Sequence, residues 1–258
     1  MMGYEQFINE IKRMTGIDLS LYKEAQMKRR LISLYIKRGC SGFRDYSERL
    51  RKEPELLAEL LDKMTINVTE FYRNKKQWEM LETKLLPDMV KKPGTLKVWS
   101  AACSTGEEPY TLAMILSKYA AQSDIRILAT DLDETVLKRA EAGVFPERSL
   151  SELPDGMRGK YFSGDGTGYK IKSDLKKSVQ FKKHNLLSDR YENGFDLIIC
   201  RNVLIYFTEA AKEAIYEKFS NALKPGGILF VGSTEQIFHA HTYGLESAGT
   251  FFYRKKQL

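Results

Sequence analysis

Two carboxylates stand just beyond strand-like runs of this sequence. Glu107 follows the apolar run 96–102, and Asp131 ends the run 125–131, so the two acids are 24 residues apart (107 to 131). In open α/β sheets, ligands bind beyond the carboxyl ends of the strands, and an acid about 20 residues after the first turn binds the ribose of a nucleotide. Both acids are therefore candidates to bind a nucleoside.

The turn that contains Glu107 has a single glycine, Gly106. A dinucleotide-binding turn needs the pattern GxGxxG, and a phosphate-binding P-loop needs a GK[ST] string. Their absence from the sequence disfavours NAD, FAD and a P-loop ligand, and leaves a nucleoside without phosphates. S-adenosylmethionine is such a ligand, since Glu107 would accept from its ammonium group and Asp131 from its ribose hydroxyls. Taken singly, Glu107 could instead be a helix N-terminal charge and Asp131 a helix N-cap.

The elements that position these acids begin near residue 95, where short apolar runs alternate with amphipathic helical segments. This alternation predicts right-handed βαβ crossovers and a mostly parallel sheet. The strand-like runs are 96–102, 125–131, 195–202 and 228–234, with a closing edge strand at 249–256, and the helical segments are 108–121, 134–143 and 209–223. We interpret the glycine-rich stretch at about 144–180, where the alternation breaks, as an insertion.

Residues 1–66 form a different part of the chain, with helical periodicity and no strand-like run. Gly16, Gly39 and Gly42 punctuate the pattern, and Pro54 suits the first turn of a last helix. The sequence thus predicts a helical N-terminal domain over 1–66, followed by an α/β domain over 67–258 that carries the insertion.

The composition is that of a globular protein, with 258 residues, 43% of them hydrophobic and 29% charged. Its net charge of +7 favours an acidic partner without naming the class. The N-terminus carries charges where a secretory signal needs an apolar stretch, so we expect a cytoplasmic protein without membrane insertion. Three scattered cysteines and three scattered histidines favour neither a disulfide framework nor a metal site.

Three strings of the sequence carry a specific resemblance. The string WSAACSTGEEPYTLA, with MTINVTEFYRN upstream and CRNVLIYF downstream, resembles the CheR family of chemotaxis receptor methyltransferases, and the resemblance covers almost the whole chain. That family transfers methyl groups from S-adenosylmethionine to glutamate side chains on the cytoplasmic helices of methyl-accepting chemotaxis receptors, forming methyl esters for sensory adaptation. The resemblance implies a Rossmann-like methyltransferase domain with a small inserted antiparallel β subdomain, behind an all-α N-terminal domain. It also implies a cytoplasmic protein, which we expect to be a monomer.

The resemblance also implies site residues, position by position. The implied cofactor contacts are Asn67, Thr69, Arg73, Glu107, Asp131, Asn185, Leu186, Arg201 and Asn202. Asn185 and Leu186 would be the pair on the adenine side. Arg73 would also lie near the transferring methyl group, and Tyr206 would be the active-site tyrosine.

The chemistry of such a transfer fits these residue types. A glutamate has an unperturbed pKa of about 4.3, so at neutral pH it is already a carboxylate nucleophile and needs no general base. The enzyme must place this carboxylate in line with the methyl group and exclude water. Arg73 would position the carboxylate through its planar guanidinium. Tyr206 would donate a hydrogen bond or present its ring face to the cationic methyl. The competing interpretation makes Tyr206 a core aromatic of the run LIYF.

A basic stretch at residues 23–38 is the candidate receptor-binding surface. Six lysines and arginines stand there against Glu24, a local balance of 6 − 1 = +5. On a helix, the apolar residues Met27, Leu31, Leu34 and Tyr35 would face the bundle. We predict that the exposed Lys28, Arg29 and Arg30 bind acidic receptor helices, and the alternative is an ordinary solvated helix face.

Two other classes of protein compete with this interpretation. An S-adenosylmethionine-dependent RNA or other nucleic-acid methyltransferase would use the basic stretch for phosphates. Enzymes that methylate base amines carry a [DN]PP[YF] string, and cytosine C5 enzymes carry a Pro-Cys nucleophile, but CRNVLIY has neither. We therefore expect no nucleic-acid partner. A non-catalytic module that senses the cofactor would have lost cofactor-binding groups, which this sequence retains at the matched positions.

Some members of the family bind a tethering peptide at the receptor C-terminus as an added strand of the β subdomain. The corresponding loop here, SGDGTGYKIK at 163–172, has few residues for extra peptide contacts. This favours a tether-independent enzyme whose insertion contacts the receptor helices or the rest of the catalytic domain.

Overall fold

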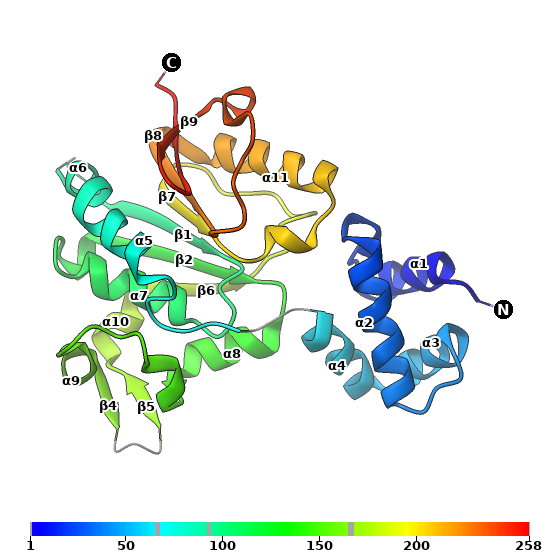
Figure 1. The fold of residues 1–258 in the computed structure, drawn as a ribbon. Helices are drawn as coiled ribbons and strands as arrows, with labels where there is room; N and C mark the ends of the chain where they lie inside the picture. The colour runs from blue at the N-terminus through cyan, green and yellow to red at the C-terminus, as the bar shows by residue number, and fades with distance from the viewer. Residues whose placement is uncertain (1, 65–67, 92–93, 165–167, 258) are drawn as a thin grey trace. The chain divides into compact units, whose positions relative to one another are not determined.

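The computed structural model describes residues 2–64, 68–91, 94–164 and 168–257. The chain forms two compact units, shown as a ribbon in Figure 1. One unit is Met1–Ile66 with Val203–Ile215, and the other is Asn67–Asn202 with Tyr216–Leu258. The segment 203–215 thus groups with the helical unit, whereas the sequence analysis assigned it to the α/β domain.

The helical unit is a bundle of short amphipathic helices. Its N-terminal elements are α1 (Tyr4–Thr15), η1 (Leu19–Leu21), α2 (Glu24–Lys37), α3 (Phe43–Lys52) and α4 (Pro54–Met64). Gly16 ends α1 with a φ of 75°, a left-handed conformation that glycine adopts readily. Phe7 packs against the rings of Phe43 and Tyr46 at centroid distances of 4.8 and 5.8 Å. The predicted all-α N-terminal part is confirmed.

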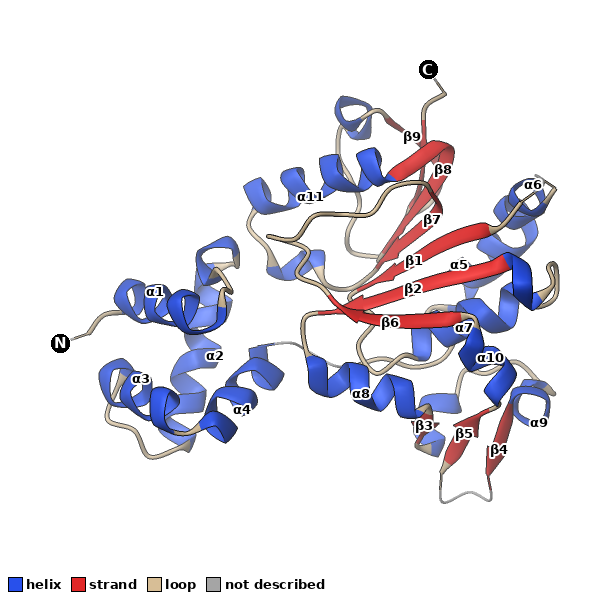
Figure 2. Cartoon of the chain, turned by 180° about the vertical axis from the view of Figure 1, so that it is seen from behind, coloured by secondary structure: helices blue, strands red, loops and turns tan. Residues whose placement is uncertain are grey.

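The second unit is built on a seven-stranded sheet of order β6-β2-β1-β7-β8-β10-β9 (Figure 2). Its strands are β1 (Leu96–Ala101), β2 (Ile125–Asp131), β6 (Val179–Lys183), β7 (Phe195–Cys200), β8 (Leu223–Val231), β9 (Leu245–Gly249) and β10 (Phe252–Lys255). The first five strands of the order are parallel, and β10 pairs antiparallel with both β8 and β9. The strand order reverses between β1 and β7, so the topology places a ligand site at their carboxyl ends.

Helices and aromatic side chains cover the sheet. The remaining elements of this part are α5 (Lys75–Met80), the π-helical turn η2 (Leu81–Leu85), α6 (Leu86–Val90), α7 (Glu107–Leu116), η3 (Gln122–Asp124), α8 (Glu134–Ala142) and η6 (Ala240–Tyr243). The turn η5 (Leu204–Tyr206) belongs to the helical unit, and α11 (Glu209–Ala222) begins in that unit and ends in this one. Val98 and Ile127 share a core with α7, whereas Trp99, on the opposite pleat of β1, contacts Phe219 of α11 at 5.5 Å between ring centroids. No helix within the described ranges is both long and apolar enough to cross a membrane.

The insertion forms a small subdomain of its own. Its elements are β3 (Val144–Phe145), η4 (Glu147–Leu150), α9 (Met157–Tyr161), β4 (Phe162–Gly164), β5 (Tyr169–Ile171) and α10 (Ser173–Lys177). The strands pair antiparallel in the order β3-β5-β4, which confirms the expected β subdomain. Residues 165–167, on which the expectation about a tether depends, lie outside the described residues.

The prediction that 249–256 is the edge strand is wrong. β10 lies between β8 and β9, and β9 (Leu245–Gly249) forms the edge. In β9 only Leu245 is buried, and the remaining residues are exposed or half-buried. An edge strand with one buried residue gives no apolar alternation, which is why the sequence pattern missed it.

Candidate active site

The loop between β1 and α7 donates hydrogen bonds to both predicted acids at the carboxyl edge of the sheet. The backbone N–H of Ser104 donates to Oδ2 of Asp131 at 2.8 Å. The hydroxyl of Thr105 donates to Oε2 of Glu107 at 2.6 Å. Because β1 and β2 are parallel neighbours, both carboxylates lie at the same edge, and the loop between them is fixed by both.

The backbone of this loop is unusual, since Ala102, Ser104 and Gly106 have φ of 61°, 50° and 97°. Left-handed conformations at non-glycine residues cost of order 1–3 kcal/mol each and cluster at ligand-binding sites. A Cβ at Gly106 would lie 2.8 Å from the Cβ of Ala140 in α8. The single glycine of the loop is therefore required both by its conformation and by the close approach of α8.

Glu107, the first residue of α7, is 3% exposed. Its carboxylate accepts from Thr105 and, at Oε1, from the hydroxyl of Ser149 at 3.2 Å. Burial raises the pKa of Glu107 above its usual range, and in the described part of the chain no cation forms an ion pair with it. A buried carboxylate with neutral hydrogen-bond donors and no paired cation fits a cationic group such as the ammonium of S-adenosylmethionine.

Asp131, at the end of β2, is 6% exposed, and burial raises its pKa. Its carboxylate accepts from the backbone N–H groups of Ser104 at 2.8 Å and Asp133 at 3.1 Å. The N-cap of α8 is Asp133, which accepts from the N–H of Thr135 at 2.7 Å. The alternative that Asp131 is itself the helix cap is therefore wrong. A carboxylate has about four acceptor sites, so Asp131 retains capacity for ribose hydroxyls.

The segment before α5 is attached to this edge through the backbone. The N–H of Phe71 donates to the carbonyl of Ser149 at 2.9 Å, and the N–H of Tyr72 donates to the hydroxyl of Thr111 at 3.2 Å. The same hydroxyl donates to the carbonyl of Glu107 at 2.7 Å. These bonds bring Arg73, the next residue, to the N-terminal end of α7.

Arg73 itself donates from Nη1 to the carbonyl of Val68 at 2.9 Å. Thr69 is half-buried, and Asn67 lies outside the described residues. These three positions belong to the string NVTEFYR that the resemblance assigned to the cofactor. Their contacts with it remain predictions.

The predicted adenine-side pair follows β6, the outer neighbour of β2. Oδ1 of Asn185 accepts from the N–H of Leu187 at 3.0 Å, and the N–H of Asn185 donates to Asp189 at 2.8 Å. Leu186 is 6% exposed, and its carbonyl accepts from the hydroxyl of Tyr191 at 2.8 Å. The pair is thus held in a hydrogen-bonded turn at the same edge as Asp131.

Arg201 and Asn202 follow β7, across the switch point from β1. Arg201 is 7% exposed, and its guanidinium contacts protein groups that are described below. Asn202 has a φ of 61°, and its N–H donates to Oε2 of Glu235 at 2.7 Å. The N–H of Gly232 donates to the same oxygen at 2.8 Å.

Tyr206 belongs to the helical unit. Its carbonyl accepts from the N–H of Lys23 at 2.9 Å, and its ring lies 5.6 Å from Cζ of Arg30. Leu204 and Phe207 are buried, whereas Tyr206 is half-buried. Tyr206 is therefore not the core aromatic of this turn.

A basic groove of about 720 Å³ lies beside Tyr206 in the helical unit. Its charged lining residues are Arg29, Arg30, Lys37 and Lys63. Lys28 is not among the residues that line the groove. Its ammonium instead lies 3.8 Å from Glu24 and 5.4 Å from the centroid of the Tyr4 ring.

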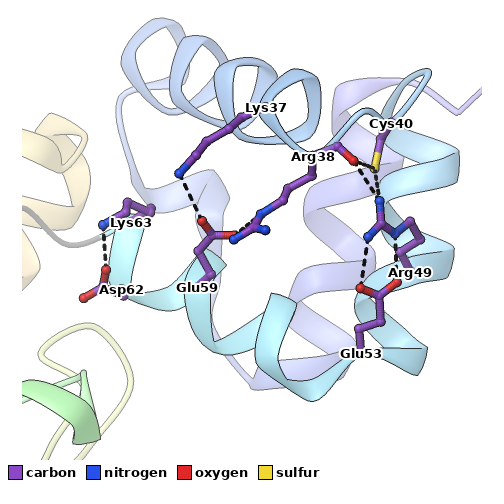
Figure 3. A network of polar contacts seen from close by, with 8 residues as sticks. All are labelled: Lys37, Arg38, Cys40, Arg49, Glu53, Glu59, Asp62 and Lys63. Atoms are coloured by element: carbon purple, nitrogen blue, oxygen red, sulfur yellow. Dashed lines mark hydrogen bonds and ion pairs between the residues drawn. The ribbon is translucent and has the colours of Figure 1, made fainter.

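The charges of the groove differ in their partners. Lys37 pairs with Glu59 at 3.4 Å, and Lys63 pairs with Asp62 at 2.8 Å (Figure 3). No such carboxylate partner is found for Arg29 among the described residues, nor for Arg30, which donates to the carbonyl of Met64. The two arginines therefore supply most of the uncompensated positive charge of the groove.

Three residues of the site were missed by the sequence analysis. Ser149 gave no signal, because a lone serine in an insertion follows no pattern. Glu108 was considered only as a helix N-terminal charge, although its side chain is only 13% exposed. Glu235 could have been found, because it follows β8 at the carboxyl edge where ligands bind.

A mostly parallel sheet with two buried acids at its switch-point edge, and without the glycine-rich turns that bind phosphates, is the arrangement expected of an S-adenosylmethionine-dependent methyltransferase. The comparisons agree with this class. Residues 67–251 match "CheR methyltransferase, SAM binding domain", and residues 2–65 match "CheR methyltransferase, all-alpha domain". The chain belongs to the CheR methyltransferase family, and its cofactor is S-adenosylmethionine.

Curated relatives cover nearly the same length. The chemotaxis protein methyltransferase of Listeria monocytogenes is 46% identical over 98% of this chain and 97% of its own. The corresponding protein of Borreliella burgdorferi is 38% identical over 86% of this chain and 83% of its own. Chemotaxis protein methyltransferase 2 of Vibrio cholerae is 36% identical over 89% and 85%. Nothing in these matches favours the nucleic-acid alternative. The chain is therefore a chemotaxis methyltransferase.

Proposed function

We propose that this protein transfers the methyl group of S-adenosylmethionine to glutamate side chains of chemotaxis receptors and forms methyl esters. The observation that carries the proposal is the groove in which Tyr206 stands beside Arg29 and Arg30. A groove with uncompensated arginines suits a substrate that presents carboxylates. The names of the relatives, chemotaxis protein methyltransferases, support receptors as the substrate.

The cofactor would be held at the carboxyl edge of the sheet. Glu107 would accept from its ammonium group, Asp131 from its ribose hydroxyls, and Asn185 with Leu186 would contact the adenine. The remaining proposed contacts are Asn67, Thr69, Arg73, Arg201 and Asn202. When bound, S-adenosylmethionine supplies an electrophilic methyl group, and its carbon–sulfur bond breaks as the methyl carbon bonds to a carboxylate oxygen.

The chain's own side chains then have a positioning task. The substrate glutamate is already ionised at neutral pH, so no residue has to remove a proton. Arg73 would orient the carboxylate through its guanidinium, and Tyr206 would contact the transferring group by its hydroxyl or its ring face. Correct orientation of two bound reactants is worth about 7–11 kcal/mol of a barrier.

The substrate helix would be recognised by charge. Arg29 and Arg30 would contact acidic residues of the receptor, and Lys28 would act at the edge of this surface, because it lies outside the groove. We expect a cytoplasmic monomer that needs no tethering peptide, with the insertion supporting the catalytic domain.

The proposal is tested with purified protein, methyl-labelled S-adenosylmethionine, and either cytoplasmic receptor fragments or RNA from the same cell. Label in the receptor protein, and none in RNA, supports it. Label in RNA, or cofactor binding without transfer to any receptor fragment, would contradict it.

A further inference from the structure

The guanidinium of Arg201 is enclosed by protein groups. Its side chain is 3% exposed and contacts two aromatic rings, with Cζ 5.5 Å from the ring centroid of Trp78 and 4.9 Å from that of Phe230. Nη2 donates to the carbonyl of Arg73 and to Oδ1 of Asn74, both at 2.8 Å. The head group of Arg201 is therefore held by contacts with other protein groups.

The two acceptors of Arg201 belong to a constrained turn. Tyr72 and Asn74, on either side of Arg73, have φ of 55° and 62°. Such left-handed residues persist only where the surroundings fix them, because each costs of order 1–3 kcal/mol. The carbonyl of Arg73 also accepts from Nε1 of Trp78 at 3.1 Å. Arg201 and Trp78 thus hold the backbone from which the Arg73 side chain extends.

Glu108 supplies the counter-charge for Arg201. Its Oε2 lies 3.6 Å from Nη1 of Arg201, and its Oε1 accepts from the hydroxyl of Ser100 at 2.8 Å. The side chain of Glu108 is only 13% exposed. The adjacent glutamates of α7 therefore differ, since Glu107 accepts from Thr105 and Ser149 while Glu108 pairs with Arg201.

We propose that the side chain of Arg201, paired with Glu108, is a positioning group that acts through Arg73, which leaves the backbone of Arg201 for the proposed cofactor contact. Removal of one partner from a buried ion pair leaves an uncompensated charge, so both residues should be needed for the turn to keep its geometry. This inference rests on the proposed function for the role of Arg73 in turnover. Its structural part, the fixed turn, does not depend on the substrate.

A double-mutant cycle tests the inference. Single-turnover rates with saturating cofactor are measured for the wild type, Arg201→Lys, Arg73→Ala and the double variant. We expect Arg201→Lys to lower the rate about 10- to 100-fold, the cost of a misplacement near 1 Å. In the Arg73→Ala background it should lower the rate no further, because the residue it positions is gone. The dissociation constant for S-adenosylmethionine should change by a smaller factor than the rate, because Arg73 is one of several proposed cofactor contacts.

The inference would be overturned if Arg201→Lys lowered the rate by the same factor in the wild type and in Arg73→Ala. It would also be overturned if Arg201→Lys weakened cofactor affinity and left the rate unchanged. If Arg201→Lys does not fold, Glu108→Gln replaces it in the same cycle, since it removes the charge and keeps the volume. Arg158→Lys is the matched control, because Arg158 also pairs with a glutamate and lies over a tyrosine ring, but it is 48% exposed.

A second readout needs no receptor. The chain has two tryptophans. The indole N–H of Trp78 donates to Arg73, and that of Trp99 donates to Thr130 at 2.9 Å. In Arg201→Lys and Glu108→Gln, solvent exchange of the Trp78 indole should accelerate while that of Trp99 stays constant. An unchanged exchange rate of the Trp78 indole in both variants would refute the fixed turn. Failure of the wild-type protein to methylate any receptor would refute only the proposed function.

Discussion

The hydroxyl of Ser149 donates to Oε1 of Glu107 at 3.2 Å, so η4 of the inserted subdomain contacts the first residue of α7. The carbonyl of the same serine accepts from the N–H of Phe71 at 2.9 Å. One residue of the insertion thereby joins the segment before α5 to a carboxylate of the proposed cofactor site. The insertion supports the catalytic domain, whatever else it contacts.

Glu107→Gln should stabilise the cofactor-free protein at neutral pH. Burial raises the pKa of Glu107 in the folded state, so its ionised form costs stability at pH values above that pKa. As the pH falls through the raised pKa, the wild-type carboxyl becomes protonated, and the advantage of the glutamine should disappear. Thermal unfolding of both proteins between pH 7 and pH 4 measures this difference.

A control variant and a measurement with bound cofactor make the thermal unfolding experiment decisive. Glu134→Gln is the control, because Lys183 lowers the pKa of this exposed carboxyl and its loss should give no gain in Tm. Saturating cofactor should raise the Tm of the wild type more than that of Glu107→Gln. A variant that is less stable than the wild type across the whole range would contradict the assignment.

Asp131→Ala should weaken binding of S-adenosylmethionine by roughly 1–3 kcal/mol, the cost of losing a buried polar partner. Titration calorimetry measures it, with Asp124→Ala, an exposed residue before β2, as control. Because alanine also leaves the N–H groups of Ser104 and Asp133 without their acceptor, Asp131→Asn provides a variant that keeps one carbonyl oxygen. Affinities equal to the wild type in both would remove Asp131 from the site.

Much of the fold could be predicted, because buried parallel strands are apolar on both faces. The run 195–200 is an example, with five of its six residues buried. Glu107 and Asp131 followed from the rule that ligands bind beyond such strands. Other features had no local signal: β9 has one buried residue, and two aspartates in the string DLDE could each have capped α8. The contact between Ser149 and Glu107 depends on a tertiary arrangement that no spacing encodes.

Charge reversal at Arg29 should raise the apparent KM for the receptor several-fold and leave cofactor affinity unchanged, since the arginine lines the basic groove. The wild-type rate should fall with added salt, and that of Arg29→Glu should fall less, because screening acts on the lost interaction. Arg44→Glu is the matched control on α3, with its side chain 78% exposed and outside the groove. Equal KM values for all three proteins would restore the solvated-face interpretation of α2.

Tyr206→Leu should lower the single-turnover rate about 10- to 100-fold with cofactor and receptor saturating, because the task left to the enzyme is orientation. Tyr206→Phe separates the two possible roles: a rate near the wild type assigns the effect to the ring, and a loss assigns it to the hydroxyl. Tyr119→Leu, at an exposed tyrosine, controls for non-specific effects. Wild-type rates in both Tyr206 variants would remove it from the active site.

The central claim is that the product is a methyl ester of a receptor glutamate, and mass spectrometry of modified receptor peptides tests it most directly. We expect a gain of one methyl group on a glutamate side chain, and its release as methanol under mild alkali, which hydrolyses esters but not methylamines. Replacement of the mapped glutamate by alanine should abolish the label at that position. Methylation that survives alkali, or that maps to a residue other than glutamate, would contradict the account.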